Sequence, residues 1–314
     1  MENLKALGTV FPGSRIGVLL IHGLTGTPTE MSAVAKELNR YGFSVFCPLL
    51  AGHCVSEAEL LKTTWEDWYA SVENAFREFS KHVDVVFAGG ISAGAVLSLR
   101  LAQRFPNKLR GLALCATTLW WDGWTIPRLS FLLPLLLRLP FTKNYRFVEA
   151  WPYGIKNEKL RERVYLQMTG SNSSEAGFSG TPWRSLRELW RLVDLVKAKL
   201  PQTKTPTIMV HASDDDIASI RNAIYIKEHI GGPSRLVPMY DSYHMITIDQ
   251  ERKQVSFEAA RYFFEQLSAQ EKNELASSAA SAKLVQSLVK VEEYKEPCAK
   301  ELLQGLSKRR SWIG

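Results

Sequence analysis

The segment that decides the fold is residues 83–97, VDVVFAGGISAGAVL. It begins as an apolar run typical of a buried strand, passes through a glycine-rich turn and continues as an apolar helical pattern. The turn contains Gly-x-Ser-x-Gly, formed by Gly90, Ser92 and Gly94. This order indicates a nucleophile elbow, a sharp turn that projects its serine while small residues let strand and helix approach closely. Ser92 is therefore the candidate nucleophile.

Buried-strand patterns recur on both sides of this turn. Apolar runs rich in β-branched residues occupy residues 16–21, 44–48, 83–88, 109–116, 207–211 and 234–239. Helical patterns lie between or after them, at residues 27–41, 65–80, 92–105, 219–230 and 248–267. This alternation predicts an α/β fold, a mostly parallel sheet flanked by helices. Functional residues are then expected in loops at the carboxyl ends of the strands.

The alternation stops at residues 119–200, a span far too long for a loop. It contains an apolar run at 129–139, a Gly/Ser-rich stretch at 170–180, and an amphipathic pattern that begins at Trp183. We expect an inserted helical cap over the active edge. The α/β core then comprises residues 1–118 and 201–267.

Residues 268–314 differ in composition from the rest of the chain. Residues 276–282 are only Ala and Ser, apolar residues recur at helical spacing from Leu284 to Val289, and residues 308–312 are basic with one tryptophan. We expect a C-terminal helical extension or tail. It either docks on the body or stays mobile to meet a partner or a membrane.

The composition is that of an ordinary globular protein. Of the 314 residues, 46% are hydrophobic and 23% are charged, which excludes collagen, coiled coils and wholesale disorder. The net charge is +7, and residues 119–200 hold 13 Lys and Arg against 7 Asp and Glu, with six of the nine tryptophans. Because no recognition motif accompanies this basic segment, it favours an anionic head group or peripheral membrane contact over nucleic acid.

Cysteine usage indicates neither a metal site nor a disulfide framework. The four cysteines show no Cys-x-x-Cys or Cys/His spacing, so we expect no metal, no cofactor and reduced thiols in the cytoplasm. Residues 1–13 lack the apolar run of a secretory signal, and 129–139 is too short to span a bilayer. A cytoplasmic protein, peripheral to the membrane at most, is expected.

A serine hydroxyl needs a base to remove its proton, and the base needs a group that orients it. The loop after strand 207–211 supplies three carboxylates, Asp214, Asp215 and Asp216. The loop after strand 234–239 supplies His244. The order Ser, acid, His is the one that follows a nucleophile elbow. The sequence therefore predicts a triad with His244 as base and one of three aspartates as its partner.

These residues resemble the α/β-hydrolase superfamily, and most of all its bacterial carboxylesterases and monoacylglycerol lipases. The resemblance rests on IHGLTGTP at 21–28, the elbow, the acid loop and SYHMITIDQE at 242–251. It covers residues 15–267, is weak in the cap, and leaves the tail as an addition.

The resemblance implies an α/β-hydrolase fold and a role for each site residue. Ser92 is the nucleophile, His244 the base and then the acid, and Asp215 the residue that orients His244. Asp215 is chosen because the family's acid lies four residues after the position of His211. The backbone N–H groups of Leu24 and Ala93 form the oxyanion hole.

The expected activity is hydrolysis of medium-chain acyl esters or monoacylglycerols through an acyl-enzyme. Trp120, Trp121 and Trp124 in the cap are candidate contacts for the acyl chain. Tyr243 stands where this branch usually has glycine, and could narrow the pocket. Acyl thioester hydrolysis and acyl transfer use the same triad and remain alternatives. A catalytically silent binding protein with this fold is an alternative of another class.

Overall fold

A computed structural model describes residues 1–127, 146–148, 151–169, 180–277, 279–289, 297 and 301–302. At its centre lies a seven-stranded sheet in the order β1-β3-β2-β4-β5-β8-β9. Its strands are β1 (Gly8–Phe11), β2 (Ile16–Ile21), β3 (Ser44–Pro48), β4 (Val85–Ile91), β5 (Leu112–Cys115), β8 (Thr207–Ala212) and β9 (Ser234–Met239). All neighbours are parallel except β1, which pairs antiparallel with β3. The mostly parallel sheet is confirmed.

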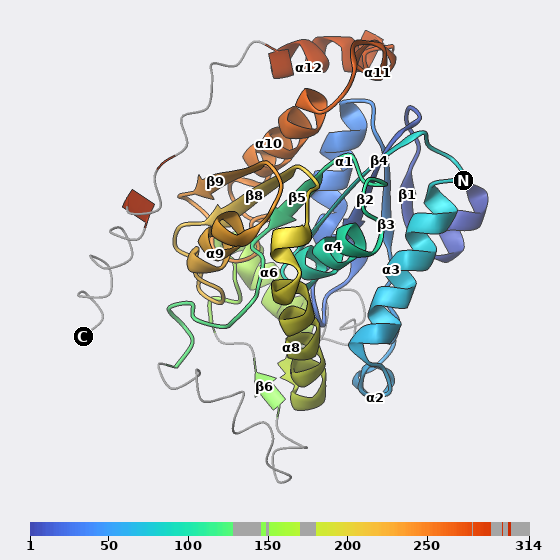
Figure 1. Ribbon diagram of the computed structural model, residues 1–314. Coiled ribbons are helices and arrows are strands. Elements are labelled where there is room, and N and C mark those ends of the chain that lie inside the picture. The colour runs from blue at the N-terminus through green and yellow to red at the C-terminus, as the bar shows by residue number, and fades with distance from the viewer. Residues whose placement is uncertain are drawn as a thin grey trace.

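Helices flank this sheet, as Figure 1 shows. They are α1 (Ser32–Arg40), α2 (Glu57–Leu61), α3 (Trp65–Phe79), α4 (Ala93–Arg104), α6 (Glu158–Thr169), α8 (Trp183–Ala198), α9 (Arg221–His229), α10 (Arg252–Glu265), α11 (Ala269–Leu275) and α12 (Ala279–Val289). Short 3₁₀ turns occupy Glu2–Ala6, Pro28–Met31 and Leu200–Gln202, and β6 (Arg146–Val148) pairs with β7 (Gly180–Pro182).

The strand patterns predicted most of the sheet. The bounds of β2, β3 and β9 coincide with the predicted ones, whereas β4 begins two residues later and continues to Ile91. The antiparallel edge strand β1 was missed. The helix predicted over 27–41 is divided into a 3₁₀ turn, Pro28–Met31, and α1.

Two apolar cores lie on opposite faces of the sheet. Within β2 the side chains alternate: Leu19 and Ile21 join the core beneath α3, α4, α8 and α9, whereas Val18 joins the core beneath α1 and α10. This period of two is the geometry of a strand covered on both faces. It explains why the buried strands read as continuous apolar runs.

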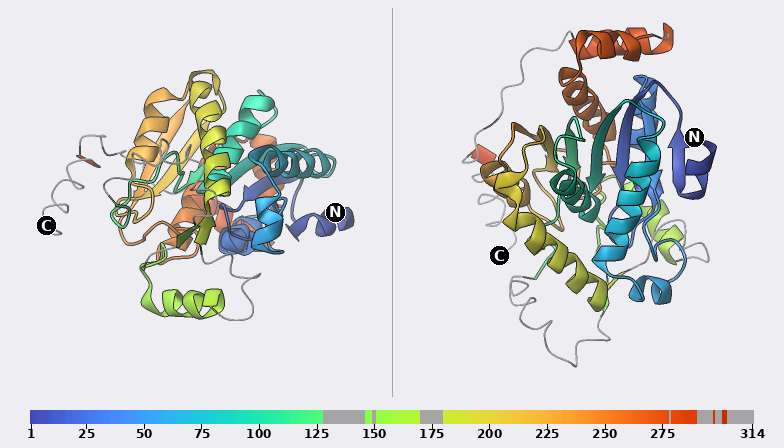
Figure 2. Two further views of the ribbon diagram at one scale, coloured as in Figure 1. Left: turned by 90° about the horizontal axis from the view of Figure 1, so that it is seen from below. Right: turned by 45° about the vertical axis from the view of Figure 1, so that its right-hand side comes forward.

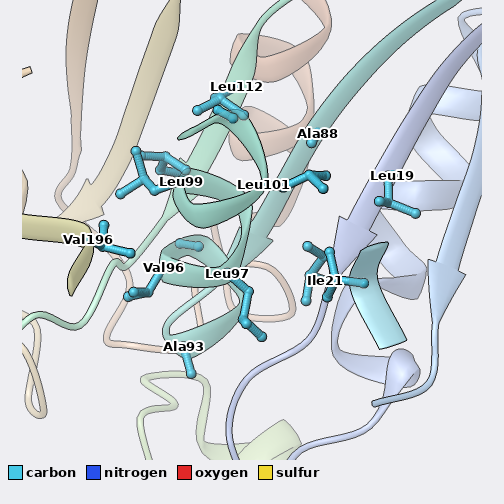
Figure 3. Packing of buried hydrophobic residues seen from close by; sticks show 14 of the residues in the cluster. Leu19, Ile21, Ala88, Ala93, Val96, Leu97, Leu99, Leu101, Leu112 and Val196 are labelled. Carbon is cyan, nitrogen blue, oxygen red and sulfur yellow. The ribbon is translucent and has the colours of Figure 1, made fainter. Parts of the chain in front are cut away.

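The elbow helix α4 lies at the centre of the first core. Figure 3 shows its residues packed against Ala88 and Leu112 of neighbouring strands and against Val196 of α8. Ala93, Val96, Leu97, Leu99 and Leu101 are at most 2% exposed. The helix that carries the elbow is therefore held by packing along most of its length.

The segment predicted as a cap is described in part. Its amphipathic helix, α8, packs on α4 and α3 over the sheet, while α6 lies beyond the helices that cover the sheet (Figure 2, left). The apolar run 129–139 and residues 170–179 lie outside the described residues. No helix among the described residues is both long and apolar enough to span a bilayer.

The helices that follow the core continue the second layer. Leu275 of α11 and Val285 and Leu288 of α12 are buried in the core beneath α1 and α10. Both α1 and α10 contact α12. The basic residues 308–312 and Cys298 lie outside the described residues.

Phe87→Ala should lower the free energy of unfolding by about 3–5 kcal/mol. The ring is fully buried, stacks on Phe263 with centroids 4.4 Å apart and meets the edge of Phe43. Urea denaturation followed by circular dichroism measures the loss. The control is Val55→Ala, at a side chain 65% exposed, where a change within about 0.5 kcal/mol is expected. Equal losses in both variants would contradict this account of the core.

Candidate active site

Ser92 occupies a backbone conformation that side chains rarely adopt. It lies between β4 and α4 with φ 55° and ψ −117°. Its N–H donates to the carbonyl of Cys115 at 3.0 Å. A Cβ added at Gly94 would lie 2.1 Å from the carbonyl oxygen of Ile21, and one at Gly90 2.5 Å from the same oxygen. Both glycines are thus required by backbone contacts, which is the arrangement expected of the elbow.

Asp215 is fully enclosed and surrounded by donors. Its Oδ1 accepts the N–H groups of Ile217 at 2.9 Å and Ala218 at 2.7 Å. Its Oδ2 lies 3.3 Å from Nε2 of His211 and 2.9 Å from Nδ1 of His244. Burial raises the pKa of Asp215, but His244, His211 and these hydrogen bonds outweigh it and hold the pKa well below its usual range. Asp215 is therefore ionised, and its partner is His244.

His244 is only 4% exposed, and its Nδ1 faces Asp215. Burial lowers the pKa of His244, yet the charge and hydrogen bond of Asp215, with smaller contributions from Asp216 and Glu30, raise it above 6.5. The bond at Nδ1 leaves Nε2 as the free nitrogen of the neutral ring. The structure thus joins two of the predicted triad residues directly.

Ser92 comes from the same sheet edge as this pair. Its loop follows β4, while Asp215 follows β8 and His244 follows β9, and the carboxyl ends of these parallel strands share one edge. In the structure Ser92 Oγ hydrogen bonds with Thr118 Oγ1 at 3.0 Å. Thr118 therefore holds the serine hydroxyl.

The two predicted oxyanion donors flank the elbow. Ala93 is the first residue of α4, so its N–H has no acceptor inside the helix. Across the part of the chain that the structure describes, neither this N–H nor that of Leu24 has a protein acceptor. The preceding N–H, of Gly23, donates to Glu30 Oε2 at 2.8 Å. Ala93 directly follows Ser92, and Leu24 follows Gly23, where an added Cβ would lie 3.7 Å from Cβ of Ser92.

His22 and Glu30 support the Gly23–Leu24 turn. Nδ1 of His22 hydrogen bonds with the Gly23 carbonyl at 2.9 Å, and its Nε2 accepts the N–H of Leu50. Burial lowers the pKa of His22 to about 3, so the ring is neutral and supports the turn through these two hydrogen bonds. Burial also raises the pKa of Glu30 to about 7.

Three groups at the site were missed from the sequence. Thr118 stands in no motif, and Glu30 stands in a predicted capping box with Thr27 that gives it no role at the Gly23 turn. His211 did have a signal, because it ends a strand four residues before Asp215. Its Nε2 donor lies 2.7 Å from the Ala218 carbonyl and also faces Asp215, so it helps to fix the acid.

The predicted substrate residues lie in different places. Trp124 and Tyr243 meet edge to face with centroids 5.4 Å apart, and Nε1 of Trp124 donates to the Asp214 carbonyl, so both lie beside the acid loop. Trp120 packs on Tyr225 of α9, and Trp121 packs on Trp190 of α8. Trp124 and Tyr243 therefore adjoin the loops of Asp215 and His244.

The described residues contain no group of three or more His, Cys, Asp or Glu side chains arranged to hold a metal.

Comparison with known proteins agrees with this fold. The family model described as serine aminopeptidase, S33, matches residues 13–251. A thermostable monoacylglycerol lipase of Bacillus sp. (strain H-257) is 28% identical over 249 residues, which cover 79% of this chain and 90% of the relative. A carboxylesterase of Bacillus subtilis (strain 168) is 26% identical over 254 residues, covering 77% and 89%.

Among solved structures, one from work on the metagenome-derived lipolytic enzymes LipS and LipT superposes with a TM-score of 0.70 at 26% identity. It covers 83% of this chain and 98% of that one. The family model spans most of the chain, from before β2 to the end of the histidine loop. The chain therefore belongs to the serine aminopeptidase S33 family of the α/β-hydrolase superfamily.

Proposed function

We propose that this protein hydrolyses medium-chain acyl esters or monoacylglycerols through a triad of Ser92, His244 and Asp215. Its class, a lipase-type serine hydrolase, follows from its family and from the lipases and esterases among its relatives. The observation that carries the triad is the enclosed His244–Asp215 pair at the sheet edge where Ser92 is held at positive φ.

The mechanism begins when Ser92 Oγ leaves Thr118 and passes its proton to Nε2 of His244 as it attacks the ester carbonyl. The oxyanion accepts the N–H groups of Leu24 and Ala93. The ionised carboxylate of Asp215, which accepts the N–H at Nδ1 of His244, stabilises the imidazolium. His244 then protonates the departing alcohol. Water, deprotonated by His244, attacks the acyl-enzyme and releases the acid, which restores Ser92.

The substrate class is inferred from the relatives and from the surroundings of the triad. One relative is named a monoacylglycerol lipase and another a carboxylesterase. Trp124 and Tyr243 place aromatic surface beside the histidine loop, suited to an acyl chain. These observations favour a small acyl ester over a peptide.

A cytoplasmic location with peripheral membrane contact is part of the proposal. The cap exposes large apolar side chains, with Val148 75%, Leu166 62% and Trp151 59% exposed. They accompany the local excess of 13 basic over 7 acidic residues at 119–200. Exposed apolar groups with positive charge are the features that bind anionic lipid surfaces.

Ser92→Ala should lower kcat on p-nitrophenyl esters by about 10⁶-fold, since the acyl-enzyme cannot form. The assay uses C2 to C16 esters, and mass spectrometry locates a fluorophosphonate label, expected on Ser92. Ser80→Ala, at the end of α3, is the matched control and should keep full activity. Residual activity near that of the wild type would refute Ser92 as nucleophile.

The same assay separates the alternatives. Labelling of Ser92 with turnover of acyl-CoA, or with transfer to an added alcohol, but without ester hydrolysis would replace the proposal by thioester hydrolysis or acyl transfer. A protein that takes no label and turns over none of these substrates would be a silent member of the fold.

The acidic limb of the kcat/KM profile should have its midpoint above pH 6.5. Asp215 holds the pKa of His244 above that value, and only the neutral ring can accept the serine proton, so activity rises as pH passes the raised pKa. Asp215→Asn should lower the midpoint, because burial then dominates. NMR titration of the His244 ring checks the assignment. A midpoint below pH 6.5 in the wild type would contradict it.

A further inference from the structure

Two further carboxylates, Asp216 and Asp249, are buried beside the triad without forming part of it. Asp216 is 1% exposed and follows Asp215 directly, and Asp249 is fully buried five residues after His244. Among the described residues neither carboxylate pairs with a Lys or Arg side chain. Their partners are backbone N–H groups, and these come from two separate parts of the chain.

Asp216 joins the histidine loop to the cap. Its Oδ1 accepts the N–H of His244 at 3.2 Å, and its Oδ2 accepts the N–H of Gly154 at 2.9 Å. Its carbonyl accepts from both the N–H and the hydroxyl of Thr125, near the start of the cap segment. One residue thus holds the catalytic histidine and two points of the cap segment.

Asp249 makes the same connection from the other side. Its Oδ2 accepts the N–H of Lys156 at 2.7 Å and that of Tyr243 at 3.0 Å, and its Oδ1 accepts the N–H of Asn157 at 2.9 Å. Asn157 in turn accepts the N–H of Leu160 in the first turn of α6. The carboxylate therefore fixes the start of α6 relative to the residue before His244.

Gly154 brings the two segments into direct contact. Its carbonyl accepts the N–H of Met245 at 2.8 Å, and its φ is 71°. A Cβ added there would lie 3.1 Å from Cβ of His244 and 3.0 Å from Cγ of Met245. The cap backbone thus lies against the root of the catalytic side chain, with room for glycine only.

We propose that Asp216 and Asp249 are positioning residues that lock the cap segment 153–157 to the histidine loop 243–245, so that the cap cannot shift without moving His244. The inference rests on the proposed function, which makes His244 the base. Charge-assisted bonds from five backbone N–H groups to enclosed carboxylates are strong and leave few alternative geometries. The cap and the base therefore behave as one unit.

Asp249→Asn tests the lock with little change in size. In the wild type both carboxylate oxygens of Asp249 accept N–H groups. The amide of the variant keeps one acceptor oxygen and places an NH₂ group where the other oxygen was, so at least one hydrogen bond is lost. Glu251→Gln is the matched control. Its carboxylate accepts the N–H groups of Tyr240 and Asp241 in the same loop, and none from the described residues of the cap.

Three readouts separate positioning from simple loss of cap structure. Hydrogen exchange follows the amides of Lys156, Asn157 and Tyr243, and NMR follows the Nδ1 proton of His244. A fluorophosphonate too small to need contacts with the cap reports the reactivity of Ser92. In Asp249→Asn we expect all three amides to exchange faster together, the Nδ1 proton signal to weaken, and labelling and kcat to fall at least tenfold with KM little changed. Glu251→Gln should stay within twofold of the wild type.

The opposite pattern would overturn the proposal. If the amides of residues 156–157 exchange faster and KM rises, while the Nδ1 proton and the labelling rate stay as in the wild type, the cap and His244 are independent. Should Asp249→Asn fail to fold, Asp216→Asn and Gly154→Ala replace it. Hydrogen exchange then follows the amides of residue 154 and His244, and the other readouts and expectations are unchanged. If the wild type neither labels nor turns over substrate, the proposed function fails, and exchange and the proton signal still decide the lock.

Discussion

The close approach of α4 to β2 is the constraint on which the rest of this structure depends. At Gly94 the helix backbone passes so near the carbonyl of Ile21 that even a methyl group would overlap it. That approach bends the chain at Ser92 to positive φ and aims the first N–H of α4 at the space beside the serine. The packing of α4 against strands and α8 holds the bend in place (Figure 3). Strain at the serine is thus sustained by the apolar core behind it.

The second organising element is the buried negative charge of Asp215. Burying an ionised carboxylate costs free energy unless hydrogen-bond donors surround it, and here two backbone N–H groups and two histidines do so. Asp216 lies directly beside it and is disfavoured as an anion: burial first, and then the charge of Asp215, raise the pKa of Asp216 to about 6. The pKa values of the two adjacent aspartates therefore shift in opposite directions because of their environments. Asp215 holds the ring of His244 through Nδ1, and Asp216 holds the backbone N–H of the same residue.

The sequence predicted the sheet and the chemical groups, because both depend on local patterns. Strand runs, the elbow and the two late loops follow from periodicity and turn composition, and they place Ser92, three aspartates and His244 at one edge. The choice of Asp215 among the three came from the family resemblance. The strand β1 was missed because a short half-buried edge strand lacks an apolar run. Thr118 was missed because its partner, Ser92, is distant in sequence, and Glu30 was missed because its position indicated a helix cap rather than a contact with the Gly23 turn. Trp120, Trp121 and Trp124 looked alike in sequence, yet Trp124 meets Tyr243 of the histidine loop, whereas Trp120 packs on α9 and Trp121 on α8.

The attachment of the cap segment has a consequence for how such a protein can change. Its entry is held where Asn222 accepts the N–H groups of Leu119 and Trp120, and its exit is α8, packed along α4. A third attachment, at Gly154 to Asn157, lies between these ends. A transplanted cap that matched only the two end attachments would leave the buried carboxylates of Asp216 and Asp249 without the N–H groups of residues 154–157. New specificities on this scaffold, natural or engineered, must therefore arise in two separate stretches, one on each side of a fixed middle anchor, rather than by exchange of the whole insertion.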